Sequence, residues 1–252
     1  MRNLRILAAL GLVTVAGAAS AEGSVTATVF GVSDYDFRGS SQSARDPALQ
    51  ASVDYADDSG LAVGAWASNV DFGASDVDIE VDVYGSFSGK FNEKTGWSTG
   101  VTYYAYPDDS DFNYIEVFGG LSYDFLSAKV WYSNKFLGDF GEDLAQATSG
   151  DDDVSAFYIE GNAAWPIPIP NFDGLSLLLH VGLSTGDYWD NAIGDDVVDY
   201  SVGVGYSTGK FNLALKFIGN DTGDVAEVES DVNSQEDRVL FTVQTTFPWK
   251  SE

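Results

Sequence analysis

Residues 78–87 read DIEVDVYGSF, and this stretch decides the fold because its polarity alternates at every residue. The odd positions carry Ile, Val, Phe or Gly, while the even positions are mostly acidic or hydroxylated. Successive side chains of a strand point to opposite faces, so a period of two predicts a β-strand with one apolar and one polar face. The same alternation recurs at 200–207 and 239–247, and at 175–184, where Leu178 breaks it.

Twelve such runs follow one another, and patterns of helical period are nearly absent. Most runs are 9–12 residues long, close to the roughly 9–11 residues that a tilted strand needs to cross a bilayer. Strands of soluble proteins more often have about 5–6 residues. The expected strands cover 24–37, 48–56, 61–70, 78–89, 96–105, 112–124, 127–136, 154–165, 174–184, 198–208, 210–218 and 238–247.

The composition excludes several classes of function. The 252 residues hold 39 Asp and Glu against 12 Lys and Arg, a formal charge of −27. Such a surface repels phosphate, so we expect no nucleic-acid partner. The absence of Cys excludes disulfides, thiolate metal sites and Cys nucleophiles, and a single His excludes a His-rich metal site. The high aromatic content, 14% of the chain, argues against disorder.

The first 21 residues have the three parts of a secretory signal peptide. A short basic start, residues 1–5, is followed by the apolar stretch 6–17 and by the small-x-small cleavage motif of residues 19–21. We therefore expect residues 1–21 to be a cleaved leader and residues 22–252 to form a single domain. No later segment has about 18 consecutive apolar residues, so no transmembrane helix is expected.

The joins between the runs alternate between short and long. The even-numbered joins are short or turn-like, with a three-proline segment at 166–173 as the longest, whereas the odd-numbered joins are longer and hold 23 of the 39 acidic residues. This alternation is typical of a transmembrane β-barrel with tight periplasmic turns and long outer loops. The expected fold is all-β: a transmembrane antiparallel up-and-down barrel of about 12 strands, in the bacterial outer membrane, with an acidic outer mouth.

Aromatic residues gather near the ends of the runs, where a membrane barrel has its interfacial girdles. The last run ends in an aromatic residue, Phe247, which looks like the signal read by the outer-membrane assembly machinery, although a five-residue overhang follows it. That machinery is therefore an expected partner. The girdle candidates are Tyr35, Phe37, Tyr103, Tyr104, Trp165, Tyr188, Trp189, Phe247 and Trp249.

A family resemblance is carried by three blocks. Residues 33–42, SDYDFRGSSQ, with their continuation 47–55, PALQASVDY, look like the opening motif of the TorF-type porin family of proteobacteria. Residues 64–72, GAWASNVDF, resemble its second block, and residues 80–85, EVDVYG, its third. The resemblance is clearest over roughly residues 24–90. It implies an outer-membrane barrel with a pore function, and it implies no substrate and no catalytic residues.

Charged residues on the polar face of the runs are the candidate pore lining. A buried charge needs a partner or water, so these groups either line a narrow hydrated channel that favours cations or pair to plug the barrel. The candidates are Asp54, Glu80, Asp82, Glu116, Lys129, Glu160, His180, Lys216 and Arg238. Near the outer mouth, we expect Arg38 to pair with Asp34 or Asp36.

The sequence offers no convincing catalytic, cofactor or metal site. His180 lies near Ser176 and Ser184, but all three face the lumen by parity, whereas a lipid-hydrolysing site should face lipid. The acidic segments at 151–153 and 221–224 lack the EF-hand pattern. We expect only diffuse binding of divalent cations there, bridging the phosphates of lipopolysaccharide.

The function expected from these observations is passive diffusion of small polar solutes or cations through an acidic, porin-like barrel, without enzymatic activity. Three alternatives remain open. The first is a closed structural or adhesive outer-membrane barrel that does not conduct. The second is a barrel hydrolase that uses His180. The third is a soluble secreted β-sandwich.

Overall fold

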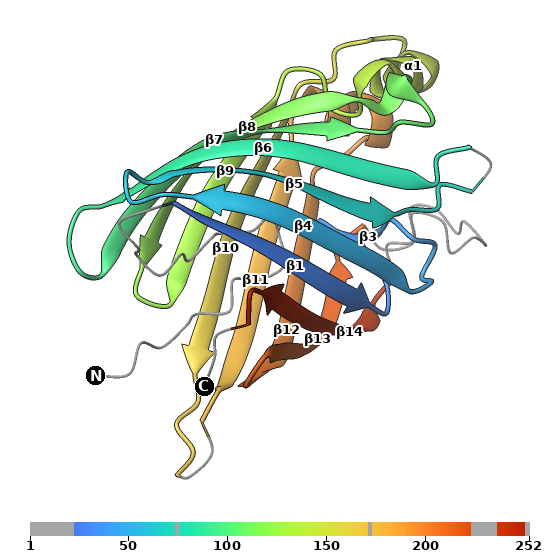
Figure 1. Cartoon of the computed structure of the whole chain (residues 1–252). Helices are drawn as coiled ribbons and strands as arrows, with labels where there is room; N and C mark the ends of the chain where they lie inside the picture. The colour runs from blue at the N-terminus through green and yellow to red at the C-terminus, as the bar shows by residue number, and fades with distance from the viewer. Residues whose placement is uncertain (1–22, 74–75, 171–172, 223–235, 250–252) are drawn as a thin grey trace.

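A computed structural model describes residues 23–73, 76–170, 173–222 and 236–249. Twelve antiparallel strands form one closed barrel, in which each strand pairs with its neighbour in sequence and β1 pairs with β14 (Figure 1). The predicted leader, residues 1–21, lies outside the described residues. The barrel strands are β1 (Ser24–Val32), β4 (Ala48–Ala56), β5 (Leu61–Asn69), β6 (Ile79–Lys90), β7 (Thr95–Ala105), β8 (Tyr114–Tyr123), β9 (Leu126–Ser133), β10 (Ala156–Pro166), β11 (Leu175–Thr185), β12 (Val197–Thr208), β13 (Phe211–Asn220) and β14 (Arg238–Phe247).

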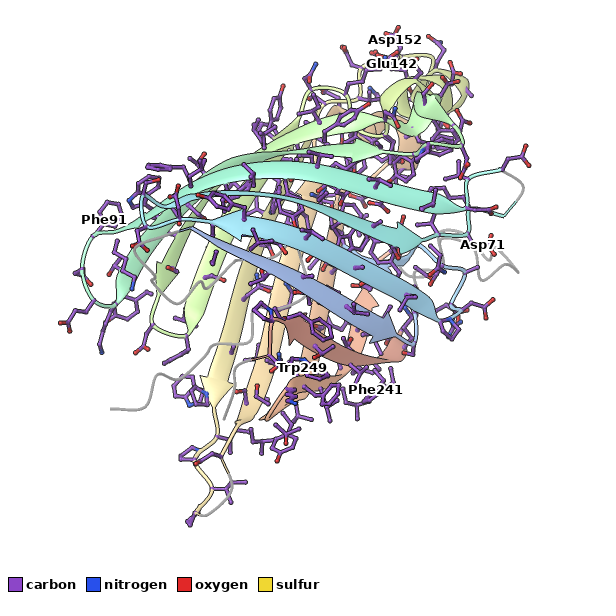
Figure 2. The ribbon with its side chains drawn as sticks, in the orientation of Figure 1. Asp71, Phe91, Glu142, Asp152, Phe241 and Trp249 are labelled. Atoms are coloured by element: carbon purple, nitrogen blue, oxygen red, sulfur yellow. The ribbon has the colours of Figure 1, made fainter. Side chains whose placement is uncertain are left out.

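The alternation of the sequence becomes two faces of the wall. In β4, inward residues such as Gln50, Ser52 and Asp54 are buried, and the residues between them are exposed. Exposed Val, Leu, Ile and aromatic side chains recur on every barrel strand, and Figure 2 shows Phe241 among them. Leu178, which breaks the pattern of its run, is buried on the inward face with Ala164 and Ala214. The prediction of a barrel of about twelve strands is confirmed.

The connections differ between the two ends of the barrel. Tight connections at 57–60, 91–94, 124–125 and 209–210, and a longer one at 167–174, lie at one end, here called the turn end (Figure 1). The long connections lie at the other end, the long-loop end, which carries Asp71, Glu142 and Asp152 (Figure 2). Short helical segments also occupy the long-loop end: η1 (Ser110–Phe112), α1 (Gly138–Thr148) and η2 (Trp189–Ile193).

The helix α1 corrects the expectation of a nearly helix-free chain. It lies in the long connection between β9 and β10, for which no helix was expected. Phe140 on its surface stacks on Phe112 of η1, with ring centroids 4.3 Å apart. Phe140 and Leu144 are four residues apart, the spacing of neighbours on one helix face. Among the described residues, no helix is both long and apolar enough to cross a membrane.

The first strand is shorter than expected, because the chain leaves the wall after Val32. Residues 33–47, here called the inward loop, form a small hairpin of β2 (Asp36–Phe37) and β3 (Ser40–Ser41). No residue from 33 to 44 is exposed, in contrast to the alternating exposure of a wall strand. The polar alternation of the sequence continues through residues 33–37, although both faces of this segment are buried within the barrel.

We predict that Gly203→Val destabilises the barrel by about 1–3 kcal/mol, the usual cost of overpacking. A Cβ at Gly203, on the inward face of β12, would lie 2.3 Å from the carbonyl oxygen of Leu215 in the neighbouring strand. The matched control is Gly119→Val, because no atom lies within 4 Å of a Cβ at that outward position. Urea unfolding in detergent micelles measures both variants, and equal stabilities would contradict the prediction.

Candidate functional site inside the barrel

All nine charged residues predicted to line the lumen lie at inward-facing positions. Asp54, Glu80, Asp82, Glu116, Lys216 and Arg238 are buried, and Lys129, Glu160 and His180 are partly buried. The barrel thus holds a charged interior behind an apolar outer surface.

The inward loop reaches across the barrel through Arg38. Its guanidinium Nη2 lies 2.7 Å from Glu116 Oε2 on β8, and both side chains are buried. Three rings flank the guanidinium, with centroids 4.6 Å (Phe37), 4.3 Å (Tyr158) and 5.7 Å (Phe136) from Cζ. Burial disfavours the charged form, but Glu116 together with Tyr104 and Tyr114 outweighs it, so the pKa of Arg38 is raised above its ordinary value. Arg38 is thus a fixed positive charge inside the barrel.

The predicted pairing of Arg38 with Asp34 or Asp36 is wrong, because both carboxylates bind Arg238 instead. Arg238 Nε donates to Asp34, and Nη2 donates to Asp36 Oδ1 at 2.6 Å. Arg238 also donates to the carbonyl oxygen of Gly39. The inward loop folds back along β14, so its carboxylates meet the last strand, while Arg38, with φ 53°, points to the opposite wall.

Two carboxylates of the inward loop differ in burial: Asp34 is buried and Asp36 is partly buried. Asp34 accepts hydrogen bonds from Ser41 Oγ at 2.5 Å and from Ser43 Oγ at 3.2 Å. Burial raises the pKa of Asp36 to about 6, against the opposing effect of the neighbouring Arg238. The loop is therefore anchored by a network of buried hydrogen bonds and ion pairs.

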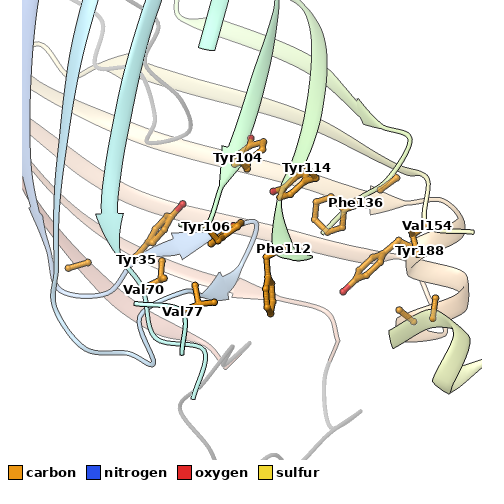
Figure 3. Packing of buried hydrophobic residues seen from close by; sticks show 14 of the residues in the cluster. Tyr35, Val70, Val77, Tyr104, Tyr106, Phe112, Tyr114, Phe136, Val154 and Tyr188 are labelled. Atoms are coloured by element: carbon orange, nitrogen blue, oxygen red, sulfur yellow. The ribbon is translucent and has the colours of Figure 1, made fainter. Parts of the chain in front are cut away.

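Apolar side chains close in around the inward loop at the long-loop end (Figure 3). Tyr104 and Tyr114 stack with ring centroids 4.4 Å apart, and Tyr35 makes an edge contact with Trp66 at 5.4 Å. We call this cluster the apolar cap. It comprises Val32, Tyr35, Ala48, Val70, Val77, Tyr104, Tyr106, Phe112, Tyr114, Phe136, Ala145, Val154, Ala156, Tyr188 and Ala192.

The apolar cap changes the interpretation of the aromatic residues. Tyr35, Tyr104 and Tyr188 are buried in it, so they do not belong to an interfacial girdle as expected. Four of the other candidates are exposed and remain available for such a girdle: Tyr103, Trp165, Phe247 and Trp249.

His180 belongs to a polar network that sequence reasoning identified only in part. Its Nε2 lies 2.7 Å from Asp199 Oδ1, and its Nδ1 lies 2.7 Å from Asn162 Oδ1. The hydroxyl of Tyr158 donates to Asp199 and lies 3.0 Å from His180 Nε2. Asp199 was missed because the alternating stretch was taken to start at residue 200. In that stretch the odd positions are polar, so the same alternation places Asp199 on the inward face.

The contacts of His180 do not form the nucleophile arrangement of a hydrolase. No hydrogen bond joins His180 to Ser176 or Ser184 within the described residues, and Ser184 Oγ is buried without any partner. An activated serine needs a base within hydrogen-bond reach. The geometry therefore gives no support to a hydrolase based on His180.

The charges are sorted between two parts of the wall. The inward carboxylates Asp54, Glu80, Asp82 and Glu116 belong to β4, β6 and β8, and we call them the acidic wall. Strands β4–β8 contain a single basic residue, Lys90, which is exposed at the turn end. Strands β9–β14 instead mix Glu160 and Asp199 with four basic side chains, those of Lys129, His180, Lys216 and Arg238.

The two lysines of the mixed wall have different surroundings. Lys129 Nζ lies over the rings of Phe118 and Trp131, 4.9 and 5.0 Å from their centroids. Glu160 accepts a hydrogen bond from Trp131 Nε1 at 2.9 Å. No ion pair within 4.0 Å is formed by Lys216 in the described part of the chain.

The comparisons with known proteins place this barrel in a family. The sequence matches the family described as "Bacterial protein of unknown function (Gcw_chp)" over residues 16–247. The chain belongs to the Gcw_chp family. A search of curated proteins finds no match. The match includes residues 33–85, which carry the resemblance to TorF-type porins.

Solved structures similar to this Gcw_chp barrel include two porins. The KdgM porin aligns with a TM-score of 0.51 and 8% identity, covering 91% of this chain and 100% of the porin. The NanC porin aligns with a TM-score of 0.52 and 10% identity, covering 87% and 98%. At these identities the likeness shows the fold alone, so the Gcw_chp chain has a porin-like barrel.

We predict that Arg38→Ala destabilises the Gcw_chp barrel by about 3–5 kcal/mol, because Glu116 is left as an uncompensated buried charge. The double variant Arg38→Leu/Glu116→Leu should recover most of this loss, because it removes both charges. Chemical unfolding in micelles measures both effects.

A surface ion pair supplies the matched control for this prediction. Lys94 and Asp124 are exposed and 3.7 Å apart, so Lys94→Ala should change the stability by no more than about 1 kcal/mol. Equal effects of Arg38→Ala and Lys94→Ala would contradict a special role for the buried pair.

Proposed function

We propose that this chain is an outer-membrane barrel that lets small polar solutes or cations diffuse passively through an acidic lumen. The observation that carries the proposal is the pairing of an apolar outer surface with a charged inner face around a closed barrel. The strands are 8–12 residues long, which suits a tilted membrane crossing. The resemblance to TorF-type porins and the expected leader support the same location.

The acidic wall supports a preference for cations. Among its four buried carboxylates, only Glu116 forms an ion pair in the described part of the chain, with Arg38 of the inward loop. A ring or wall of carboxylates favours cation entry into a pore. One KdgM structure is described as a complex with disordered oligogalacturonate. Oligogalacturonate is an anion, and the acidic wall would repel it.

The inward loop forms the constriction in this proposal. It lies inside the long-loop end. The ion pair of its Arg38 with Glu116 of β8 holds one side of it, and Arg238 of β14 holds the other. The apolar cap narrows the same end. We therefore expect a small conductance, and a path for solutes of low molecular mass.

The apolar cap also favours a second candidate function, a closed structural or adhesive barrel. In that case the long loops, with Glu142 and Asp152 at the surface (Figure 2), bind surface partners and the lumen does not conduct. Lipopolysaccharide phosphates bridged by divalent cations are proposed partners of these loops. The assembly machinery that inserts the barrel is a proposed partner of β14, which ends at Phe247.

Planar-bilayer recording across a salt gradient tests the leading proposal. We predict stepwise conductance with a reversal potential of the sign for cation selectivity, because the acidic wall attracts cations. Neutralising part of that wall with Asp54→Asn should shift the reversal potential toward zero. The matched control is Asp152→Asn at the outer surface, which should leave it near the wild-type value. A wild-type preference for anions would contradict the acidic pathway.

A double variant that removes the Arg38–Glu116 ion pair separates the two candidate functions. We predict that Arg38→Leu/Glu116→Leu raises the single-channel conductance above that of the wild type, because the inward loop loses its contact with β8. The closed-barrel candidate predicts a silent wild type. Conductance that appears only in the variant would support the closed barrel, and no conductance in either protein would refute the porin proposal.

A further inference from the structure

His180 joins three neighbouring strands through its two ring nitrogens. From β11, its Nδ1 lies 2.7 Å from Asn162 Oδ1 on β10, and its Nε2 lies 2.7 Å from Asp199 Oδ1 on β12. Asp199 is buried, whereas the imidazole is partly exposed to the interior of the barrel and can exchange protons with water there. His180 is also the single histidine of the chain, so a histidine signal from this protein reports on this residue alone.

The atom that faces Nδ1 is a hydrogen-bond acceptor. Asn162 Nδ2 donates to Glu160 Oε2 at 2.8 Å, and this contact sets the orientation of the amide. Turned the other way, the amide oxygen would face a carboxylate. Asn162 therefore presents its oxygen to His180, and only a protonated Nδ1 can donate to it.

The atom that faces Nε2 is also an acceptor. Asp199 accepts the hydroxyl of Tyr158 at 3.0 and 3.2 Å, and a hydrogen bond to a carboxylate favours its ionised form. Two lone pairs do not stay 2.7 Å apart without a proton between them, so we place that proton on His180 Nε2. Donation from Tyr158 to Nε2, 3.0 Å away, would leave the contact with Asp199 without a proton.

The charges in contact with the imidazole are negative. Asp199 lies at 2.7 Å and Glu160, on the other neighbouring strand, at 3.9 Å. His180 is the only basic group within 4.0 Å of either carboxylate in the described part of the chain. Strand β11 carries no other charged side chain. Both carboxylates therefore favour the charged form of the ring.

Other charged groups surround this network, and each has contacts of its own. Lys129 of β9 has its Nζ over two aromatic rings. From the inward loop, Arg38 lies over the ring of Tyr158 and pairs with the acidic wall, and Asp36 is bound by β14. No contact of these three side chains with His180 is found within the described ranges.

A glycine makes room for this network across β11. Gly182 stands between Glu160 of β10 and Asp199 of β12 in the strand register. A Cβ at Gly182 would collide with the Tyr158 hydroxyl and with Asp199 Oδ2. The missing side chain thus lets residues of β10 and β12 meet over the strand that carries His180.

We propose that His180 is an imidazolium that clamps β10, β11 and β12 together, and that this clamp makes the barrel sensitive to pH. In the charged form both ring nitrogens donate, whereas after loss of one proton a bare nitrogen faces an acceptor oxygen. The stabilisation is complete below the ordinary titration range of histidine, about pH 6.5, and is lost as the pH rises through the titration in the folded barrel. Tyr158 links the clamp to the inward loop, because its hydroxyl binds Asp199 and its ring lies against Arg38.

NMR spectroscopy of the chain labelled with ¹⁵N at histidine, refolded in detergent micelles without a histidine tag, tests the clamp. We expect both ring nitrogens to give the signals of a protonated ring at about pH 7. Asp199→Asn should lower the midpoint of the titration by about 1 pH unit or more, because a carboxylate in contact favours the charged ring. Asp152→Asn, which removes a carboxylate from the outer surface (Figure 2), should leave the midpoint unchanged.

Two results would overturn the proposal: a wild-type ring with a single protonated nitrogen at about pH 7, or equal midpoints in Asp199→Asn and Asp152→Asn. If Asp199→Asn does not fold, urea unfolding of the wild type and of His180→Gln decides instead. The stability advantage of the wild type should shrink from about pH 6 to about pH 9, and a constant advantage refutes the clamp. A barrel that does not conduct would titrate in the same way, so failure of the porin proposal leaves this test intact.

Discussion

The buried ion pair between Arg38 and Glu116 is the contact on which the interior depends. It joins a loop that follows β1 to a strand on another part of the wall, and both side chains are buried. A buried charge without its partner is costly, so Arg38 fixes where the loop lies. Of the three rings around the guanidinium, Phe136 belongs to the apolar cap and Phe37 packs against it.

The same pair sets the electrostatics of the lumen. Arg38 pairs with one carboxylate of the acidic wall, whereas Asp54, Glu80 and Asp82 form no ion pair within the described residues. The mixed wall opposite carries its own pairs, such as His180 with Asp199. The interior is therefore neither uniformly acidic nor fully paired. Its acidic side chains are concentrated along one side, next to the inward loop.

The wall was predictable from the sequence, whereas the contents of the barrel were not. A period of two depends only on which face is apolar, and this is why 48–56 and 238–247 were assigned with the bounds that β4 and β14 have. The partner of Arg38 lies 78 residues away, and no local pattern encodes it. The bend after Val32 was missed because the inward loop keeps the same polar alternation while burying both faces.

The candidate site was predictable only as a set of positions. Parity placed Glu80 and Asp82 inward, but the partners of each carboxylate depend on adjacent strands and on the inward loop, as the Tyr35 hydroxyl on Glu80 shows. The helix α1 was missed although Phe140 and Leu144 have helical spacing, and its contact with Phe112 of η1 joins residues 28 apart that no local pattern links.

The placement of Arg238 links the loop to the closure of the barrel. This residue opens the last strand and holds Asp34 and Asp36, more than 200 residues earlier in the chain. Contacts of such separation form late, because the intervening chain must be ordered first. The hairpin at 36–41 therefore lacks this second anchor until β14 has joined β1. Closure of the barrel between these two strands and full anchoring of the inward loop are linked, so a barrel that is open there also has a loop held by Arg38 alone.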